Sequence, residues 1–578
     1  MNYALDRLHA ECAELLTETG LLGGFVPTAT EPKPNIPADL AFPAFQVARE
    51  LGAGNPAAFA ARLAEAVRTR PDGLVGKVEA AGPFVNFSVA PEQFSRAVLA
   101  EVTEGGAGYG GDDRGAGQNV ILEFSSPNIA RKMHVGHLRS TVIGNSLRLI
   151  FQALGYHVIA DNHLGDWGTQ FGSLLAARDI WGWPAQMDTD PIEALVQIYA
   201  RFHAAAEADP ALRDLARTWF RRLEEGDPDA RATWRVLIDL TLTEFARTYA
   251  RLGVSFDTEH GESFYESMLP GVVQEALDKG VARQEPDGAV SVSFDETLPS
   301  FLIRKRDGVT LYQTRDIATC LYRWQTYAPD RNVYVVGQEQ KLHFQQVFET
   351  VRRMGHTEIA DRSVHVSFGA ITDAAGQKFS MRKGTAIFLD EVLDEAVSRA
   401  SATIAAKIGE GRTELTGEEQ DELGQAVGLG AVIYNDLYQG PDRAIRFDWD
   451  VMLSFEGNSA PYIQYTHARC RSILRKAGTS GESADAGLLT EPGEQAVVKQ
   501  LARLPQAIRT AGERYQPSSV AEWTYELARA FTRFYHDHPV LDAATPELRD
   551  ARLRLTAGVA QGLHTGLGLL GIQAPERM

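Results

Sequence analysis

Residues 120–137 have the sequence Val-Ile-Leu-Glu-Phe-Ser-Ser-Pro-Asn-Ile-Ala-Arg-Lys-Met-His-Val-Gly-His, and this stretch decides the fold. Its first five residues are a mostly apolar run, which is typical of a buried strand. Residues 134–154 predict a helix, and 158–160 are a second short apolar run. A strand, a crossover helix and another strand indicate a parallel sheet of Rossmann type. We therefore expect a multidomain α/β protein built around such a sheet.

The flanking sequence predicts three further regions. The first is a small α+β unit with helices at 3–20, 45–51, 57–67 and 91–102 and a strand at 84–89. The second is a helical, polar insertion near 190–290, after which strand signals return at 311–312, 332–337 and 364–368. The third is an almost entirely helical region from about 391 to 572.

One glycine-rich stretch, 104–113, contains a formal G-x-G-x-x-G from Gly106 to Gly111. A dinucleotide-binding fingerprint needs a strand before the glycines and a helix after them. Here the predicted helix comes first and the strand follows, so we interpret the stretch as a flexible linker.

Length, cysteine usage and charge limit the class of protein. A chain of 578 residues is too long for one core. The three cysteines, at 12, 320 and 470, form no zinc-binding spacing, which suits a reducing cytosol. The start of the chain does not resemble a signal peptide, and we expect a cytoplasmic protein with no membrane association. The net charge of −19 argues against nonspecific adhesion to nucleic acid, but not against a local basic face for one folded RNA.

Two histidines, His134 and His137, begin the predicted helix and share one of its faces. Helix N-termini attract anions, and imidazole N–H groups placed there can bond to phosphate oxygens. Gly136, which has no Cβ, allows a base or ribose to approach the backbone. On its own the H-x-x-H pattern also fits capping or surface histidines. Metal ligation would need a third ligand, which is not evident nearby.

A second, cationic segment lies at 376–384, Gly-Gln-Lys-Phe-Ser-Met-Arg-Lys-Gly. Lys378, Arg382 and Lys383 place three cations within six residues, after the predicted strand at 364–368. A loop of this kind can close on a triphosphate and stabilise a leaving pyrophosphate. A solvated basic loop is the alternative. The presence of both segments in one chain favours an ATP site without a P-loop.

The two segments resemble the HIGH and KMSKS signatures of class I aminoacyl-tRNA synthetases, and in particular those of the arginyl-tRNA synthetase family. The resemblance covers essentially the whole chain. Its blocks are 123–130, 134–141, 162–172, 312–318, 335–340, 447–450, 457–465 and 574–578. It implies ATP-dependent ligation of L-arginine to its cognate tRNA through arginyl-adenylate, with activation that requires bound tRNA.

The resemblance also implies the site residues. The implied catalytic group is His134, Gly136, His137, Lys378, Ser380, Arg382 and Lys383. The implied ATP-binding residues are Pro127, Ile129, Arg131, Lys132, His134, His137 and Lys378. The implied arginine-binding residues are Glu123, Ser125, Asn128, His137, Tyr312, Asp316 and Gln340. A carboxylate such as Asp316 suits the planar, permanently charged guanidinium of arginine.

One departure from the signatures leaves a question open. Met381 stands where the second lysine of KMSKS is usual. The resemblance implies that a cation just before the first histidine motif compensates, but Arg131, Lys132, Arg382 and Lys383 all remain candidates.

The resemblance implies three domains and their partners. Residues 1–112 would be an additional domain that contacts the tRNA elbow. Residues 113–390 would be the catalytic domain, with its insertion near 173–300. Residues 391–578 would contact the tRNA stem and, from about 455, bind the anticodon through residues such as Tyr462, Tyr465, Arg469, Arg471 and Trp523. ATP with Mg²⁺ is the expected cofactor, no zinc or other metal site is expected, DNA is not an expected partner, and we expect a monomer.

Rival interpretations explain less of the chain. Cysteinyl-tRNA synthetase would need thiol-rich zinc ligation, which three separated cysteines do not easily supply. A small H-x-G-H nucleotidyltransferase or a pantothenate–β-alanine ligase would leave about 400 residues unexplained. A catalytically inactive tRNA-binding protein would not need both signatures.

Overall fold

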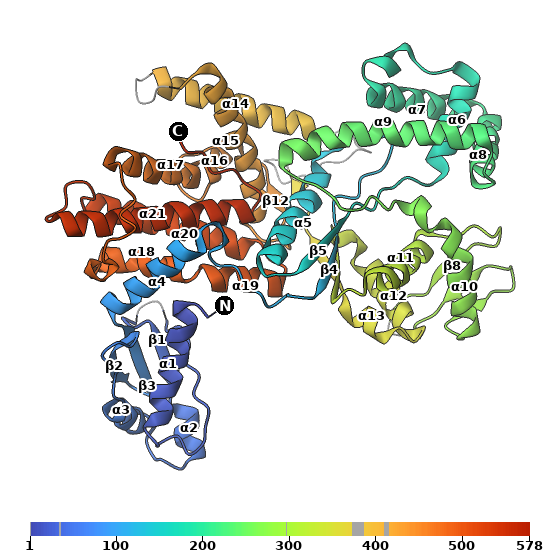
Figure 1. Ribbon diagram of the computed structural model, residues 1–578. Coiled ribbons are helices and arrows are strands. Elements are labelled where there is room, and N and C mark those ends of the chain that lie inside the picture. The colour runs from blue at the N-terminus through green and yellow to red at the C-terminus, as the bar shows by residue number, and fades with distance from the viewer. Residues whose placement is uncertain (1, 34–35, 296–297, 373–386, 410–414) are drawn as a thin grey trace.

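A four-stranded parallel sheet lies at the centre of the chain in the computed structural model, which describes residues 2–33, 36–295, 298–372, 387–409 and 415–578 (Figure 1). The strand order is β10-β9-β4-β5. The strands are β4 (Asn119–Glu123), β5 (His157–Asp161), β9 (Arg331–Gly337) and β10 (Ser363–Phe368). Helix α5 (Val135–Ala153) connects β4 to β5, as the sequence predicts. Strand order reverses between β4 and β9, so the expected ligand crevice lies beyond the carboxyl ends of these strands.

Two lobes follow the first two strands of the sheet (Figure 1). The helical lobe contains α6 (Thr169–Trp181), α7 (Pro191–Ala208), α8 (Pro210–Glu224) and α9 (Pro228–Leu252). The mixed lobe contains an antiparallel sheet of order β6-β7-β8 and has its own hydrophobic core. Its elements are η3 (Glu262–Met268), α10 (Leu269–Asp278), β6 (Ala282–Gln284), β7 (Val290–Val292), β8 (Phe301–Arg304), α11 (Tyr312–Tyr327), η4 (Gln338–Gln340), α12 (Lys341–Arg353) and α13 (Thr357–Arg362).

Two expectations for this part of the chain are wrong. Strand β6 lies within the stretch near 190–290 expected to be helical, and β7 begins at its end; both were missed because three-residue strands are too short to show a period of two. The strand signal at 311–312 belongs instead to the start of helix α11. Leu311 is its N-cap, and an N-cap has the extended backbone of a strand residue (φ −112°, ψ 168°).

The N-terminal unit is an α+β fold, as expected. Its helices are α1 (Ala4–Glu18), α2 (Phe45–Glu50), α3 (Pro56–Ala66) and α4 (Pro91–Gly105). Its antiparallel sheet has the order β1-β3-β2, with β1 (Leu40–Pro43), β2 (Val75–Ala81) and β3 (Phe84–Val89). The sequence predicts only β3, because most side chains of β2 are exposed and give no apolar alternation.

The stretch around Gly106–Gly111 is not a nucleotide loop, in agreement with the sequence, but the expectation of a flexible linker is wrong. The side chain of Tyr109 is buried, and its hydroxyl donates to the carbonyl of Leu501 (3.0 Å). The hydroxyl of Tyr3 donates to the carbonyl of Gly111 (2.7 Å). The first contact attaches the connection to helix α18 of the C-terminal region, and the second attaches it to the start of α1.

The C-terminal region is helical, as predicted. Its helices are α14 (Leu389–Gly409), α15 (Gly417–Leu437), α16 (Trp449–Met452), α17 (Ala460–Ala477), α18 (Pro492–Ala502), α19 (Leu504–Arg514), α20 (Ser518–Asp537) and α21 (Pro546–Leu569). The short strands β11 (Ile371–Thr372) and β12 (Ile445–Arg446) pair in parallel and join this region to the end of β10. Helix α4 packs against α18 and α21, so the first part of the chain lies against the last (Figure 1).

Candidate active site

The first-signature histidines lie where β4 gives way to α5. His134 is the N-cap of α5, and its Nδ1 accepts the backbone N–H of Gly136 (3.0 Å). The Nδ1 of His137 accepts the backbone N–H of His134 (3.1 Å). The two ring centroids are 4.0 Å apart. A Cβ on residue 136 would lie only 2.7 Å from the His134 ring, so glycine is required there.

These contacts determine which protons the two imidazoles carry. A neutral imidazole has one N–H, and an Nδ1 that accepts a hydrogen bond places that proton on Nε2. Burial, followed by the charge of His134, lowers the pKa of His137 to about 3. Burial and then Arg131 also lower the pKa of His134. Both rings are therefore neutral at pH 7, and both have an Nε2–H to donate.

The loop between β4 and α5 has a strained backbone. Ser125, Ser126 and Ala130 have positive φ angles of 69°, 50° and 61°, which non-glycine residues rarely adopt. A side-chain oxygen accepts the backbone N–H of each one. The acceptors are Ser140 for Ser125 (2.9 Å), Asn162 for Ser126 (3.2 Å) and Thr241 for Ala130 (3.1 Å). These three bonds come from α5, from the turn after β5 and from α9, and they hold the loop in place.

A buried arginine lies at the carboxyl ends of β4 and β5. Arg323 of α11 contacts the carboxylates of Glu123 and Asp161, each at 2.6 Å. Glu123, Asp161 and His163 lie close enough to share a metal ion, but both carboxylates already pair with this guanidinium. Ser125 is also buried and bonded, since its hydroxyl contacts those of Tyr249 and Thr141, each at 2.8 Å.

Two other predicted arginine-binding residues share the first turns of α11. Tyr312 is 54% exposed, and Asp316 is more buried. The Nε2 atom of His343, on α12, lies 2.5 Å from the Asp316 carboxylate. The His343 ring also lies against Tyr312, with centroids 4.9 Å apart. Gln340, just before α12, is exposed.

The remaining predicted residues of the β4–α5 loop differ in their solvent exposure. Asn128 is exposed, whereas Pro127 and Ile129 are buried. The backbone of the two buried residues pairs with Gly165, because the Gly165 N–H donates to the Pro127 carbonyl and the Ile129 N–H donates to the Gly165 carbonyl (3.1 Å each). A Cβ at residue 165 would lie 2.2 Å from the Asn128 amide oxygen.

The two cations before the histidines have different surroundings. Lys132 is bound by the carboxylates of Glu193 (3.0 Å) and Asp190 (3.7 Å), from the start of α7. Arg131 has no ion pair with any residue that the structure describes, is exposed, and lies over the ring of Tyr199. It is also the residue whose charge lowers the pKa of His134, after burial.

Lys378, Ser380, Arg382 and Lys383 lie outside the described residues, but the residues flanking their segment are described. Before it, the carbonyl of Gly369 accepts from Arg139 of α5 (2.8 Å). After it, the backbone of 387–389 pairs with that of 133–135, since Val135 N–H donates to Ile387 (3.0 Å) and Leu389 N–H donates to Met133 (2.9 Å). Both flanks therefore join the helix that carries the histidines.

The predicted tRNA-binding residues separate into two groups. Trp523 is only 4% exposed, and its indole N–H donates to the Gln500 carbonyl (2.7 Å), so it belongs to the bundle core. Tyr462, Tyr465, Arg469 and Arg471 are all partly exposed on α17. The Arg469 guanidinium lies over the Tyr465 ring, 4.7 Å from its centroid, and Arg471 pairs with Glu576 (2.6 Å).

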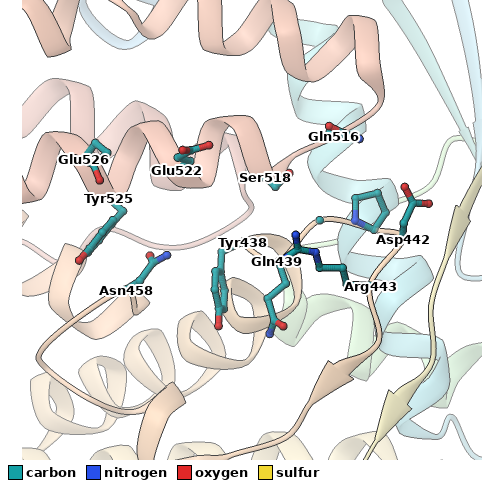
Figure 2. A pocket seen from close by; sticks show the side chains of 12 residues that line it. Tyr438, Gln439, Asp442, Arg443, Asn458, Gln516, Ser518, Glu522, Tyr525 and Glu526 are labelled. Atoms are coloured by element: carbon teal, nitrogen blue, oxygen red, sulfur yellow. The ribbon is translucent and has the colours of Figure 1, made fainter. Parts of the chain in front are cut away.

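A pocket of about 570 Å³ lies between the connection at 438–443 and helix α20, and its lining residue Tyr525 contacts the ring of Tyr462 (Figure 2). Its lining includes the carboxylates of Asp442, Glu522 and Glu526 and the guanidinium of Arg443. With three carboxylates to one cation, this pocket is poorly suited to nucleic-acid phosphates.

Comparison with known proteins places this architecture in a class. Residues 105–449 match the family described as tRNA synthetases class I (R), catalytic domain. Residues 463–578 match the DALR anticodon binding domain. The fold is similar to that of Thermus thermophilus arginyl-tRNA synthetase, with a TM-score of 0.80 and 24% identity over 99% of this chain and 100% of that chain. It is also similar to the Plasmodium falciparum arginyl-tRNA synthetase structure, with a TM-score of 0.81 and 21% identity over 99% of each chain. This is a class I tRNA synthetase architecture.

Full-length relatives identify the family. The arginine–tRNA ligase of Chloroflexus aggregans is 50% identical over 581 residues, which is 100% of both chains. That of Halothermothrix orenii is 43% identical over 520 residues, which is 89% of this chain and 90% of the relative. The chain belongs to the arginine–tRNA ligase (arginyl-tRNA synthetase) family. Its activity is therefore the ATP-dependent charging of tRNA with arginine (EC 6.1.1.19), as the sequence resemblance predicts.

Sequence reasoning missed several residues that hold the site together. Arg323, His343 and Tyr249 were not predicted, and each contacts a predicted residue. Two of them had a signal in the spacing. Arg323 is seven residues after Asp316, and His343 is three residues after Gln340, so each follows a predicted residue at helical spacing.

Proposed function

We propose that the carboxyl ends of β4 and β9 hold ATP and arginine side by side, with the histidine pair on the ATP side. The observation that carries this proposal is the hydrogen bonding of the pair, which leaves both Nε2–H groups able to donate. In the first step the arginine carboxylate attacks the α-phosphorus of ATP, forming arginyl-adenylate and releasing pyrophosphate. Neutral donors aimed at phosphate oxygens stabilise the charge that develops there. In the second step arginine passes to the 2′-hydroxyl of the terminal adenosine of the tRNA and AMP leaves.

The arginine side chain is proposed to bind at Asp316, with Tyr312 as the exposed wall beside it. Asn128 and Gln340 are open to a ligand, and with His137 they complete the group that contacts arginine. Glu123 already pairs with Arg323, and Ser125 already bonds to Tyr249. Glu123 and Ser125 would therefore bind arginine while keeping these contacts. The negative charge of Glu123 is then shared between an internal guanidinium and the α-ammonium of the substrate.

We propose Arg131 as the replacement for the lysine that is absent at Met381. Lys132 is held by two carboxylates, whereas Arg131 has no such ion pair among the described residues and affects His134 electrostatically. Gly136, Pro127 and Ile129 would shape the ATP pocket through their backbone. Lys378, Ser380, Arg382 and Lys383 would contact the phosphates from the second signature. Mg²⁺ would accompany ATP, since phosphate oxygens and water suit it better than a dedicated cage. No structural zinc is proposed.

We propose that the chain divides at about residues 112 and 390 into an elbow-contacting, a catalytic and a stem- and anticodon-contacting domain. Tyr462, Tyr465, Arg469 and Arg471 on α17 are the proposed anticodon contacts, because they combine partly exposed rings with cations. Trp523 is buried and is not included. We propose a cytoplasmic monomer that does not bind DNA. Among the described helices, none is long and apolar enough to cross a membrane.

Radiolabelled pyrophosphate exchange tests the proposal. We expect exchange with arginine alone among the amino acids, and only when tRNA is present. Asp316→Asn should raise the KM for arginine at least tenfold with little change for ATP. Arg131→Gln should raise the KM for ATP, and Lys132→Gln, its matched control, should have a smaller effect. Equal losses for both substrates in Asp316→Asn would remove the pocket assignment, and equal effects at 131 and 132 would remove the assignment of Arg131.

A further inference from the structure

The imidazole of His343 touches both Asp316 and Tyr312. We infer that His343 is a positioning residue for arginine recognition, which fixes the Asp316 carboxylate in the orientation that a guanidinium requires. This inference rests on the proposed role of Asp316 and adds a residue from a different helix, α12, to the arginine pocket.

The contact is buried and specific. His343 is 7% exposed, and its Nε2 lies 2.5 Å from Oδ2 of Asp316. Within the part of the chain that the structure describes, this is the only hydrogen bond made by the Asp316 side chain. A carboxylate accepts about four hydrogen bonds on its two oxygens. Most of its accepting capacity therefore remains for a ligand, while its rotation is blocked.

The protonation of His343 follows from its other nitrogen. Nδ1 is buried and has no partner among the described residues. A proton on Nδ1 would leave an unsatisfied buried donor, which is costly. The neutral ring with its proton on Nε2 avoids this, because that proton is donated to Asp316. The carboxylate is then held by a neutral group, and its negative charge stays available for the substrate cation.

The ring contacts support the same role. The imidazole lies between Tyr312 (centroids 4.9 Å apart) and Phe344 (5.2 Å), so it has little freedom to turn. His343 also lies three residues after Gln340, which is the N-cap of α12. Helix α12 thus brings a proposed arginine contact and the support for Asp316 to the same pocket. Guanidinium recognition depends on planar, directed hydrogen bonds, so a freely rotating carboxylate would bind it less well.

Steady-state kinetics of His343 variants test this inference. We expect His343→Ala to raise the KM for arginine about 10- to 100-fold, the loss that follows when a charge-assisted contact is disordered, and to change the KM for ATP less than twofold. His343→Gln, whose amide N–H can reach the same carboxylate oxygen, should restore the KM for arginine to within about threefold of the original value. In an Asp316→Asn background, His343→Ala should add little, because both changes remove the same interaction.

A matched control separates positioning from folding. His356 of the same lobe also bonds a carboxylate, that of Glu275 (2.7 Å), so His356→Ala should lower thermal stability comparably and leave the KM for arginine unchanged. A tenfold or larger increase in the KM for arginine in His343→Gln would overturn the inference. So would equal effects of His343→Ala on the KM values for arginine and ATP. If His343→Ala does not fold, His343→Gln alone provides the test. If Asp316→Asn itself leaves arginine use intact, the proposed pocket fails, whatever His343 does.

Discussion

Hydrogen bonds from the main chain set the tautomers of the two signature histidines, His134 and His137. Each Nδ1 accepts a main-chain N–H within its own turn, so neither ring needs a second side chain to set its tautomer. The spacing in the sequence predicted that His134 and His137 share a face. Capping was one alternative from the sequence, but the spacing did not predict that His134 is the cap while His137 bonds to its N–H, because that depends on the extended backbone of His134 (φ −112°, ψ 166°).

A pH titration tests the neutral state of the pair. Burial lowers the pKa of His137 to about 3, against about 6.5 for an unperturbed imidazole. The folded protein then binds fewer protons than the unfolded chain, so this group destabilises the fold increasingly as pH falls below about 6.5. We expect the histidine NMR signal that His137→Asn removes to show no titration between pH 8 and 5. A midpoint near 6.5 for that signal would contradict the assignment.

Site residues were easier to predict from the sequence when the residues they act with are close to them in the chain. Asp316 and Tyr312 came from one recognisable block, and the structure places them together on α11. The ion pair of Glu123 with Arg323 spans 200 residues. No spacing rule connects those two positions, since only the folding of α11 over the ends of β4 and β5 brings the guanidinium between the carboxylates.

At the scale of elements, the β4–α5 loop is notable for having its strained residues held by neighbouring elements. Three non-glycine residues with positive φ would be costly in a free loop, at about 1–3 kcal/mol each. Bonds from α5, from the turn after β5 and from α9 offset this cost. The helical lobe therefore takes part in shaping the candidate active site, although it was predicted only as an insertion.

Tyr249 of α9 offers a direct test of this contribution. Its hydroxyl contacts Ser125 (2.8 Å) and Asn162 (3.2 Å), two residues of the loop and its support. We expect Tyr249→Phe to lower kcat/KM for arginine about tenfold, because it removes a hydroxyl that makes two hydrogen bonds in a buried network. Tyr156→Phe is the matched control, since Tyr156 precedes β5 at the opposite end of the sheet. Equal rates for the two variants would show that α9 does not support the loop.

Helices and strands were predicted correctly where burial gives the sequence a clear hydrophobic pattern. Strands β4, β5 and β9 and helix α5 are buried on most sides, and their apolar runs predicted them with the correct connections. Strands β2, β6 and β7 were missed because they are exposed or only three residues long. The connection at 104–113 was misjudged, since its order comes from Tyr109 and its contact with Leu501, more than 390 residues away.

At the scale of the whole molecule, a buried ion pair joins the first signature to the C-terminal helices. Arg139 of α5 is 1% exposed, and its Nε lies 3.2 Å from the Asp436 carboxylate of α15. Arg139 also donates to the carbonyls of Gly369 (2.8 Å) and Arg443 (2.6 Å). One side chain thus connects the histidine helix, the residues before the second signature and the strand β12 region.

Removing the carboxylate should therefore destabilise the protein strongly. Burial raises the pKa of Asp436 to about 6, while Arg139 opposes the rise, so the pair is mostly ionised at neutral pH. Asp436→Ala would leave a buried guanidinium without its counter-charge, at a cost of about 3–5 kcal/mol. Urea unfolding at pH 7.5 should show a clearly lower midpoint. Asp442→Ala, on the exposed part of the neighbouring connection, should stay within about 0.5 kcal/mol of the original. Similar midpoints for both variants would contradict this role of the pair.

The packing of the first part of the chain against the last has a consequence for synthesis on the ribosome. Arg509 of α19 donates to Asp6 at 2.7 Å, across 503 residues of sequence, and α4 packs against α18 and α21. At about 5–20 residues per second, the partners of the N-terminal unit are made roughly 25–100 s after it. During that interval Leu99 and Val102 of α4, which lie beside Gly558 of α21 in the folded protein, lack the cover of that helix. The N-terminal unit of the nascent chain must therefore be protected from aggregation until helices α18 and α21 have been synthesised.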